Sequence, residues 1–327
     1  MQLIDSYGRK IDYLRLAVTD RCNLRCTYCM PAYGIDFVDR ADLLTYEEMH
    51  RVLRIVRNLG ITKLRITGGE PFVRRGLIDF LERVHQENTF NEIHLTTNAT
   101  LTESHLDRFG SAGIQSVNIS LDTLNRERFF DITRRDKLPT VLNSIDSLYH
   151  QGIKLKINMV VMAGSNADEI VDMARLAQTR NIDVRFLEEM PFNGTENGNV
   201  SFMDYRDIRT QLENELGQLH PKQVEHGQTA TVYSVDGFQG TLGIIPSFSR
   251  TFCGTCNRLR ITPKGLVKTC LYGKEVMDLR NLLRFGASDD DIAQALMLAV
   301  QQKPKNGFEA EADREADIHA SMATIGG

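Results

Sequence analysis

The sequence predicts an α/β fold, in which a barrel or incomplete barrel of six βα units is closed by a smaller C-terminal α+β domain. From the start to about residue 190, short β-branched runs alternate with amphipathic segments of helical period. The 327 residues allow one barrel-sized domain and a smaller second one. A doubly wound open sheet stays an alternative, because it is built from the same βα units.

Six strands are expected inside these units, each a short run of β-branched and aliphatic residues. They cover residues 13–19, 63–68, 92–97, 116–121, 155–162 and 183–189. The first long helix between them begins at a capping box formed by Thr45 and Glu48 and ends at Gly60. The segments 138–152 and 166–181 are expected to be helical in the same way.

The pattern changes after residue 190. A loop is expected over 191–201, a helix over 203–217 and antiparallel strands around glycine-rich turns over 229–246. We therefore predict a partial barrel over residues 1–220 and a second domain over residues 221–327. The charged segment 303–327 has little apolar content, which predicts a mobile tail.

The bulk composition is that of an ordinary globular protein, with 42% hydrophobic and 25% charged residues. The chain has no apolar run long enough for a signal peptide or a membrane span, so we expect a cytoplasmic protein without a membrane partner. Six cysteines in a reducing compartment are expected to bind metal or clusters rather than form disulfides. The net charge of -4 argues against nucleic-acid binding.

Three cysteines follow the first predicted strand in the segment CNLRCTYC. Cys22, Cys26 and Cys29 have the spacing C-x3-C-x2-C. A closed zinc site takes four ligands, whereas three thiolates leave one iron of a 4Fe–4S cluster open to an external ligand. The trio therefore predicts such a cluster, and a zinc site with a distant fourth ligand is the alternative.

The other predicted strands also end in polar or glycine-rich segments. Because the carboxyl ends of parallel strands meet at one mouth, these segments are expected to face one site. They are GGEP at 68–71, TTN at 96–98, SLD at 120–122 and EEMP at 188–191. The two glycines of GGEP would let backbone approach a bound molecule, although a tight turn alone would also explain them.

A second cysteine trio lies in the C-terminal region. Cys253, Cys256 and Cys270 again lack a fourth cysteine. A second cluster with an open iron would let a substrate atom bind iron directly. A zinc ribbon completed by His220 or His226 is the alternative.

Basic residues occupy unusual positions inside predicted strands. They are Arg15, Arg65, Lys156 and Arg185, and the segment CNRLR adds Arg258 and Arg260. A cation that points into a barrel must meet an anion, because its desolvation otherwise costs several kcal/mol. Together these residues predict a polyphosphate pocket, although each alone would also fit an outward-facing ion pair.

The cysteine segment CNLRCTYC, with GGEP in the next βα unit, resembles the radical S-adenosylmethionine superfamily. This resemblance implies an incomplete (β/α)6 TIM-like barrel, a 4Fe–4S cluster, and S-adenosyl-L-methionine bound to its open iron. Over essentially the whole chain, TDRCNLRCTYCMP, RITGGEP, TTN, NISLDTL, FCGTCNRLR and the terminal IGG resemble the GTP 3′,8-cyclase family.

The resemblance implies roles for individual residues. It gives the first cluster to Cys22, Cys26 and Cys29 and a second 4Fe–4S cluster to Cys253, Cys256 and Cys270. It gives the cofactor contacts to Tyr28, Gly69, Ser120 and Met190, and the GTP contacts to Arg15, Arg65, Thr96, Lys156, Arg258, Leu259 and Arg260. Arg258 and Arg260 are also the catalytic candidates, as stabilisers of a reduced intermediate. The terminal pair Gly326 and Gly327 is expected to reach into the barrel, and Glu189 replaces a usually apolar residue.

The activity that the resemblance implies is the radical rearrangement of GTP to a 3′,8-cyclised dihydro nucleotide, the first step of molybdenum cofactor biosynthesis. It also implies a reductant protein, product transfer to a cyclic pyranopterin monophosphate synthase, and a homodimer. Two other functions stay open at this point. One is a radical enzyme of another type, such as a peptide maturase, and the other is a zinc-binding scaffold without catalysis.

Overall fold

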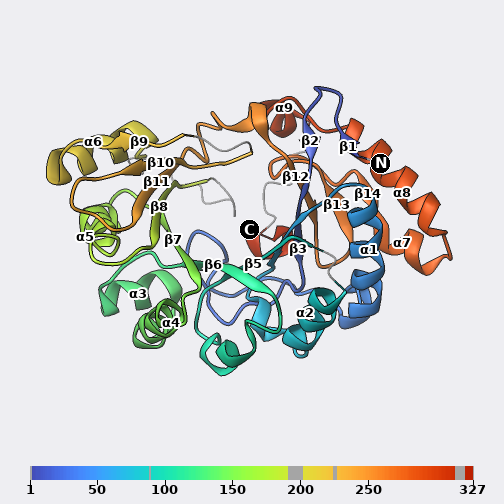
Figure 1. Cartoon of the computed structure of the whole chain (residues 1–327), viewed down its shortest axis with the longest axis horizontal. Helices are drawn as coiled ribbons and strands as arrows, with labels where there is room; N and C mark the ends of the chain where they lie inside the picture. The colour runs from blue at the N-terminus through green and yellow to red at the C-terminus, as the bar shows by residue number, and fades with distance from the viewer. Residues whose placement is uncertain (1, 88–89, 191–201, 224–226, 314–320, 327) are drawn as a thin grey trace.

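One curved sheet of twelve strands organises the molecule, in the order β14-β13-β12-β3-β4-β5-β6-β7-β8-β11-β10-β9. The computed structural model describes residues 2–87, 90–190, 202–223, 227–313 and 321–326. Within these residues the edge strands β14 and β9 are not paired with each other, so the barrel is incomplete. Figure 1 shows the helices on the outer face of the sheet and the chain's C-terminus inside its curve.

The strands that pair in parallel form the central part of the sheet. They are β3 (Tyr13–Ala17), β4 (Lys63–Thr67), β5 (Glu92–Thr97), β6 (Ile114–Ser120), β7 (Lys154–Val161), β8 (Asp183–Glu188), β11 (Thr241–Ile245) and β12 (Arg258–Ile261). Antiparallel strands extend both ends: β9 (His220–Pro221), β10 (Thr231–Ser234), β13 (Leu266–Lys268) and β14 (Met277–Asp278). A separate hairpin contains β1 (Leu3–Ile4) and β2 (Lys10–Ile11).

Helices connect the strands and cover the sheet. They are α1 (Tyr46–Asn58), α2 (Leu77–Gln86), α3 (Arg126–Thr133), α4 (Leu138–His150), α5 (Ile170–Arg175), α6 (Tyr205–Leu216), α7 (Leu279–Arg284), α8 (Asp289–Gln301), α9 (Gly307–Ala312) and α10 (Met322–Ile325). Helix α1 begins at the predicted capping box, in which the Thr45 hydroxyl accepts from the Glu48 backbone N–H at 3.1 Å. Its exit is made by Gly60, whose φ of 91° lies in the left-handed region.

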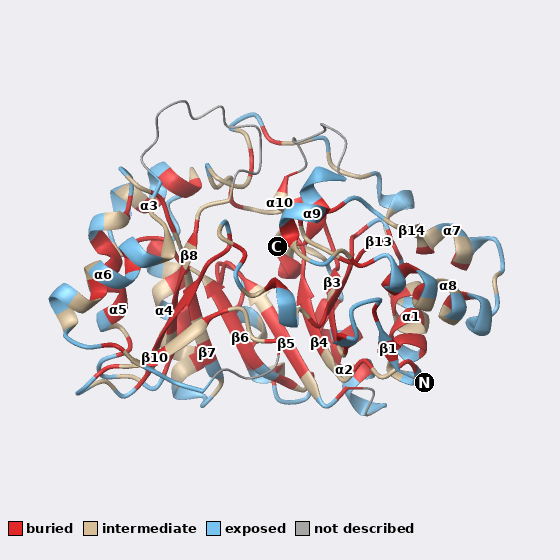
Figure 2. Ribbon diagram, turned by 90° about the horizontal axis from the view of Figure 1, so that it is seen from above, coloured by how far each residue is buried: buried red, intermediate tan, exposed pale blue. Residues whose placement is uncertain are grey.

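Side-chain alternation along the strands separates an apolar outer layer from a polar inner one. In β3, Leu14 and Leu16 are fully buried in the hydrophobic core, whereas Arg15 between them lines a cavity on the other side. In β12, Arg258 and Arg260 face the cavity in the same way. Figure 2 shows the buried sheet enclosed by helices with exposed outer faces. A period of two therefore explains why cations stand inside apolar strands.

The predicted architecture is confirmed: the six expected strands are β3 to β8, and the strands after residue 228 include the antiparallel pair β10 and β11. These later strands also join the barrel sheet, because β11 pairs with β8 and β12 pairs with β3, both in parallel. The domain boundary near residue 220 stays a prediction. The loop expected over 191–201 lies outside the described residues.

The prediction of a mobile tail is wrong for the described part of residues 303–327. Ala310 and Ile325 pack with Tyr272 in a small hydrophobic cluster of their own, although Phe308 stays exposed. Composition counts apolar residues but does not show where each one is buried.

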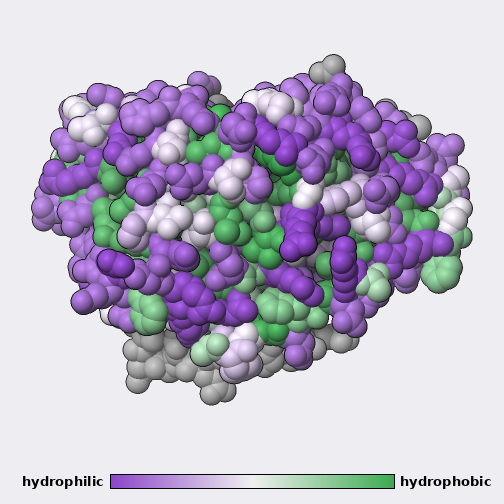
Figure 3. Space-filling view, turned by 90° about the horizontal axis from the view of Figure 1, so that it is seen from below, coloured by the Kyte–Doolittle hydropathy of each residue, from purple (hydrophilic) through white to green (hydrophobic). Residues whose placement is uncertain are grey.

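Much of the outer surface is hydrophilic. Figure 3 shows one face on which polar side chains predominate and apolar ones gather toward the middle. Among the described residues, no helix has both the length and the hydropathy that a membrane crossing requires.

Candidate functional site

A cavity of about 300 Å³ extends from the carboxyl ends of the parallel strands into the barrel. Its walls come from the segments that follow β3, β4, β5 and β8, from the end of β11, and from inward-facing residues of β3, β6, β7, β8 and β12. Both cysteine trios and two residues of α10, Met322 and Ala323, also line it. The prediction that the first trio and the strand-end segments face one site agrees with this lining, and the second trio faces the same cavity.

The first trio lies on the loop after β3. The loop turns at its cysteines, where the Cys29 backbone N–H donates to the Cys26 carbonyl at 3.0 Å. The Asn98 side-chain amide, from the end of β5, lies 3.7 Å from the Cys22 sulfur. None of the three cysteines is in a disulfide. Sulfur atoms on a loop at the mouth of the barrel are placed to bind an external group.

Burial and acidic neighbours disfavour free thiolates in this trio. Burial raises the pKa of Cys22 to about 12, and the Glu70 carboxylate adds to the effect. Burial and the Asp122 carboxylate raise the pKa of Cys26. A bound cation removes this penalty, because a metal-coordinated thiol is deprotonated outright. The donor set therefore fits an iron–sulfur cluster.

The glycine pair of GGEP allows the cysteine loop to pack against β4. A Cβ on Gly69 would lie 2.4 Å from the Arg21 carbonyl oxygen, and one on Gly68 would lie 2.4 Å from that of Thr19. The Gly69 N–H donates to the Thr19 carbonyl at 2.8 Å. The glycines thus fit the loop backbone closely, while both also line the cavity.

The predicted cofactor residues Tyr28, Gly69, Ser120 and Met190 all line the cavity. The Tyr28 hydroxyl donates to the Asp122 carboxylate at 2.9 Å. The Met190 sulfur accepts from the Tyr272 hydroxyl at 3.2 Å, which connects the end of β8 with the second cysteine region. The structure therefore brings these four residues together with the first trio.

The second trio faces the same cavity from the opposite part of the fold. Cys253 lies in a 3-10 turn, Cys256 follows it, and Cys270 comes after β13. Burial raises the pKa of the Cys256 thiol, but the charges of Lys303 and Arg258 outweigh it and lower that pKa to about 6. The second trio thus has basic surroundings.

The zinc alternatives gain no support from the described residues. No three His, Cys, Asp or Glu side chains there are placed to hold a single metal ion. His220 lies in the edge strand β9, 3.5 Å from the Asp236 carboxylate, and does not line the cavity. His226 lies outside the described residues.

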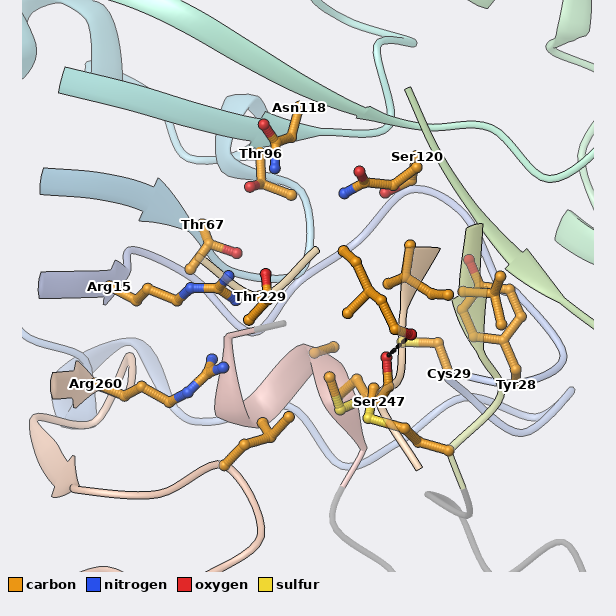
Figure 4. Close-up of a pocket in the computed structure, with 18 of the residues that line it drawn as sticks. Arg15, Tyr28, Cys29, Thr67, Thr96, Asn118, Ser120, Thr229, Ser247 and Arg260 are labelled. Atoms are coloured by element: carbon orange, nitrogen blue, oxygen red, sulfur yellow. Dashed lines mark hydrogen bonds between the residues drawn. The ribbon is translucent and has the colours of Figure 1, made fainter. Parts of the chain in front are cut away.

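Guanidinium groups concentrate beside the second trio. Figure 4 shows Arg15 and Arg260 extending side by side into the cavity from β3 and β12, opposite Cys29 and Tyr28. The Nε atoms of Arg15, Arg185 and Arg258 are buried and have no hydrogen-bond partner in the described part of the chain. Burial and the nearby Arg260 hold the pKa of Arg15 well below its usual range. Buried donors without acceptors fit an anionic ligand.

Three predicted GTP residues are not among those that line the cavity. Arg65 lies behind it and donates to the Leu95 carbonyl and the Thr96 hydroxyl, both at 3.2 Å. Lys156 has its ammonium 3.7 Å from the Asp183 carboxylate. The side chain of Leu259 is fully buried in the core. Thr96 does line the cavity, so Arg65 touches the site through it.

The end of the chain joins the two sides of the cavity. The Ser321 hydroxyl donates to the Cys29 carbonyl at 2.7 Å, and Arg260 donates to the Gly326 carbonyl at 2.8 Å. Gly326 has a φ of 80°, and a Cβ there would lie 2.6 Å from that of Ala17. The expectation that the terminal segment enters the barrel is confirmed for Gly326, while Gly327 lies outside the described residues.

Sequence reasoning missed several lining residues. Asn118 and Asn158 point into the cavity from the centres of β6 and β7, and Thr229 and Ser247 border it near β10 and β11. The two asparagines carried a signal, since an amide inside an apolar strand is as unusual as an arginine. Thr229 and Ser247 had no such signal.

Comparisons with known proteins agree with this geometry. The family model described as Radical SAM superfamily matches residues 16–177, and the one described as Molybdenum Cofactor Synthesis C matches residues 182–309. GTP 3′,8-cyclase of Geobacter sulfurreducens is 44% identical over 334 aligned positions, which cover 100% of both chains. GTP 3′,8-cyclase of Heliobacterium modesticaldum is 41% identical over 307 residues, which cover 92% of this chain and 93% of the relative's chain.

A longer relative and two solved structures extend the comparison. Molybdenum cofactor biosynthesis protein 1 of mouse is 40% identical over 93% of this chain, which spans only 48% of the mouse protein. SuiB of Streptococcus suis, solved bound to S-adenosylmethionine, has a TM-score of 0.63 at 15% identity, covering 87% of this chain and 67% of SuiB. The anSMEcpe structure with bound AdoMet has a TM-score of 0.55 at 15% identity, with coverage of 93% and 84%. At these identities the two structures show a shared fold.

The incomplete parallel barrel and the cysteine loop after its first strand define a radical S-adenosylmethionine enzyme. Proteins of this class carry a 4Fe–4S cluster and S-adenosylmethionine. Within the class, the chain belongs to the GTP 3′,8-cyclase family, as the full-length identity to its members shows.

Proposed function

We propose that this chain rearranges GTP to (8S)-3′,8-cyclo-7,8-dihydroguanosine 5′-triphosphate, the first step of molybdenum cofactor biosynthesis. One observation carries the proposal: two cysteine trios and a group of buried guanidinium groups face a single cavity. A radical generator, a substrate-binding cluster and a polyphosphate site would then be within reach of one another.

The first trio and its neighbours are assigned to radical generation. Cys22, Cys26 and Cys29 would hold the first cluster, and Tyr28, Gly69, Ser120 and Met190 would position S-adenosylmethionine. When bound, this pair supplies the 5′-deoxyadenosyl radical that takes a hydrogen atom from the ribose 3′ carbon. The protein's part is to hold the two reactants in register and exclude water.

The second trio and the arginines are assigned to GTP. Cys253, Cys256 and Cys270 would hold a second 4Fe–4S cluster, and its open iron would be available to bind an atom of the guanine. Guanidinium groups bind phosphate oxygens through paired N–H donors, and the unpartnered Nε atoms beside this trio support that use. We assign the GTP contacts to Arg15, Thr96, Arg258 and Arg260, which line the cavity, with Arg258 and Arg260 also stabilising the reduced intermediate. The contacts expected from Arg65, Lys156 and Leu259 stay predictions, because these residues do not line it.

The remaining assignments concern the protein's surroundings. A reductant protein would deliver electrons, and a cyclic pyranopterin monophosphate synthase would take the product. A homodimer and a cytoplasmic location complete the proposal. These four points follow from the family resemblance and the composition.

The deciding experiment incubates the anaerobically reconstituted protein with S-adenosylmethionine, a strong reductant, and either GTP or ATP. 5′-Deoxyadenosine and the remaining nucleotide are measured by chromatography and mass spectrometry. We expect deoxyadenosine in step with loss of GTP and none with ATP. Deoxyadenosine formed regardless of the nucleotide would instead indicate a radical enzyme with another substrate, such as a peptide.

Metal analysis tests the non-catalytic alternative. Two 4Fe–4S clusters predict about eight iron atoms and as many sulfides per chain. Zinc without iron or sulfide, in protein purified without oxygen, would support a scaffold and exclude both kinds of radical enzyme.

A further inference from the structure

The segment 303–305, between α8 and α9, lies directly against the second cysteine trio. Lys303 begins it and is only 3% exposed, which is rare for a lysine. Its ammonium donates to the Arg258 carbonyl at 2.9 Å and also to the Thr269 carbonyl. Arg258 comes two residues after Cys256, and Thr269 immediately precedes Cys270. One buried ammonium thus joins the two segments that carry these cysteines.

The same segment is also connected to the third cysteine. The Arg9 guanidinium donates to the Cys253 carbonyl at 3.0 Å, the Lys305 carbonyl at 2.9 Å and the Pro304 carbonyl at 2.7 Å. Arg9 is itself oriented by the Asp5 carboxylate, 2.6 Å from its Nε. Segment 303–305 is therefore the common attachment point for the backbone around all three cysteines.

The charge of Lys303 has no carboxylate to balance it among the described residues. The ammonium's hydrogen bonds above go to neutral carbonyl oxygens, and none of the ion pairs in the described part of the chain includes it. The Lys303 ammonium also lies beside the Cys256 sulfur. A buried cation needs an anion nearby, and the thiolates of the second trio are in place to provide it.

We propose that Lys303 is a positioning residue for the second cluster, and that its positive charge also favours the reduced form of that cluster. The inference rests on the proposed function, because the second cluster is part of it. Reduction adds negative charge to a cluster, so a fixed positive charge beside one of its thiolates raises the reduction potential. Removal of the ammonium lowers the potential and also frees the Cys256 and Cys270 segments.

The test isolates the second cluster in a Cys26→Ala background, in which the first trio is incomplete. Lys303→Met removes the charge and the hydrogen bonds. Lys305→Met is the matched control. It removes the same charge only two residues along the chain, but the Lys305 side chain is exposed. Two quantities are measured on the full-length reconstituted protein: the midpoint potential by EPR-monitored redox titration, and the rate of iron loss to a chelator.

We expect a more negative midpoint and several-fold faster iron loss in Lys303→Met, and neither change in Lys305→Met. Lys303→Gln keeps hydrogen-bond donors but has no charge, so it serves if Lys303→Met does not fold. It is expected to show the lower midpoint with slower iron loss than Lys303→Met. A midpoint in the Lys303 variants equal to that of Lys305→Met overturns the inference.

The Cys26→Ala protein without a second substitution, the parent, shows whether the inference about Lys303 fails alone or together with the proposed function. If the Cys26→Ala parent retains no iron after reconstitution, the proposed second cluster is absent and both ideas are overturned. If the parent holds about four iron atoms and the Lys303 variants leave its potential unchanged, the cluster stands and the role of Lys303 is refuted.

Discussion

The two cysteine trios have the same number of ligands but opposite electrostatic surroundings. Carboxylates of Glu70 and Asp122 border the first trio and add to the burial that raises its thiol pKa values. Lys303 and Arg258 border the second trio and lower the pKa of Cys256 to about 6. The number of cysteine ligands therefore does not distinguish the two sites. They differ in the charged side chains that surround the cysteines.

This difference matches the two small molecules of the proposed reaction. S-Adenosylmethionine carries a sulfonium cation, which suits the acidic side chains of Glu70 and Asp122 behind the first trio. GTP carries a polyanion, which suits a wall where the Nε atoms of Arg15, Arg185 and Arg258 have no hydrogen-bond partner among the described residues. The terminal helix α10 lies between them, since Ser321 contacts the Cys29 carbonyl and Arg260 contacts the Gly326 carbonyl.

The largest expected effect comes from removing one ligand on each side. Cys256→Ala should abolish GTP consumption and remove about half of the iron. Cys26→Ala should abolish deoxyadenosine formation and leave the iron of the second cluster. Iron and sulfide are measured together with both products. Loss of nearly all iron in Cys256→Ala would mean that the two sites do not form independently.

The positions of the two cysteine trios could be predicted from the sequence, whereas most of the charged residues around them could not. Cysteine spacing and strand arginines located both sides of the cavity, because ligand spacing and a period of two are local properties. Lys303 and Arg9 could not be identified, because each acts on cysteines that are distant in sequence and neither belongs to a motif. The tail was misjudged for a similar reason, since Ala310 and Ile325 pack against Tyr272, which is distant in sequence.

Glu70 provides a pH-dependent test on the acidic side. Burial raises the pKa of the Glu70 carboxyl from its ordinary value of 4.5 to about 7. An acid whose pKa is raised by folding contributes stability at low pH, and this contribution is lost as pH rises toward 7. At about 1.4 kcal/mol per pKa unit, the loss between pH 4 and 8 is about 3 kcal/mol.

Glu70→Gln has no such titration, so it isolates the effect. The free energy of unfolding of the variant minus that of the wild type should become more positive from pH 5 to pH 8. Denaturant unfolding at several pH values measures it. A difference that stays constant over this range would show that Glu70 is charged throughout.

On the basic side, Arg260→Ala should weaken GTP binding. The loss of a hydrogen bond to a charged group costs about 2 kcal/mol, which corresponds to roughly 30-fold in the dissociation constant. S-Adenosylmethionine binding should change little, because it is assigned to the opposite wall. Arg206→Ala, on the exposed surface of α6, is the control for charge alone. Equal weakening of both ligands would contradict the division of the cavity.

The smallest expected effect sharpens the comparison at a single hydroxyl. The Tyr28 hydroxyl donates to the Asp122 carboxylate at 2.9 Å, so Tyr28→Phe removes one hydrogen bond from the acidic wall. If this hydrogen bond contributes about 1 kcal/mol to the binding free energy, the variant should bind S-adenosylmethionine roughly fivefold more weakly. Calorimetry on the reconstituted protein measures this affinity. Tyr46→Phe removes a hydroxyl that bonds the Arg75 carbonyl at 3.1 Å, away from the cavity, and should have no such effect. If Tyr28→Phe weakened GTP binding as much as cofactor binding, the acidic wall would not be specific to the cofactor.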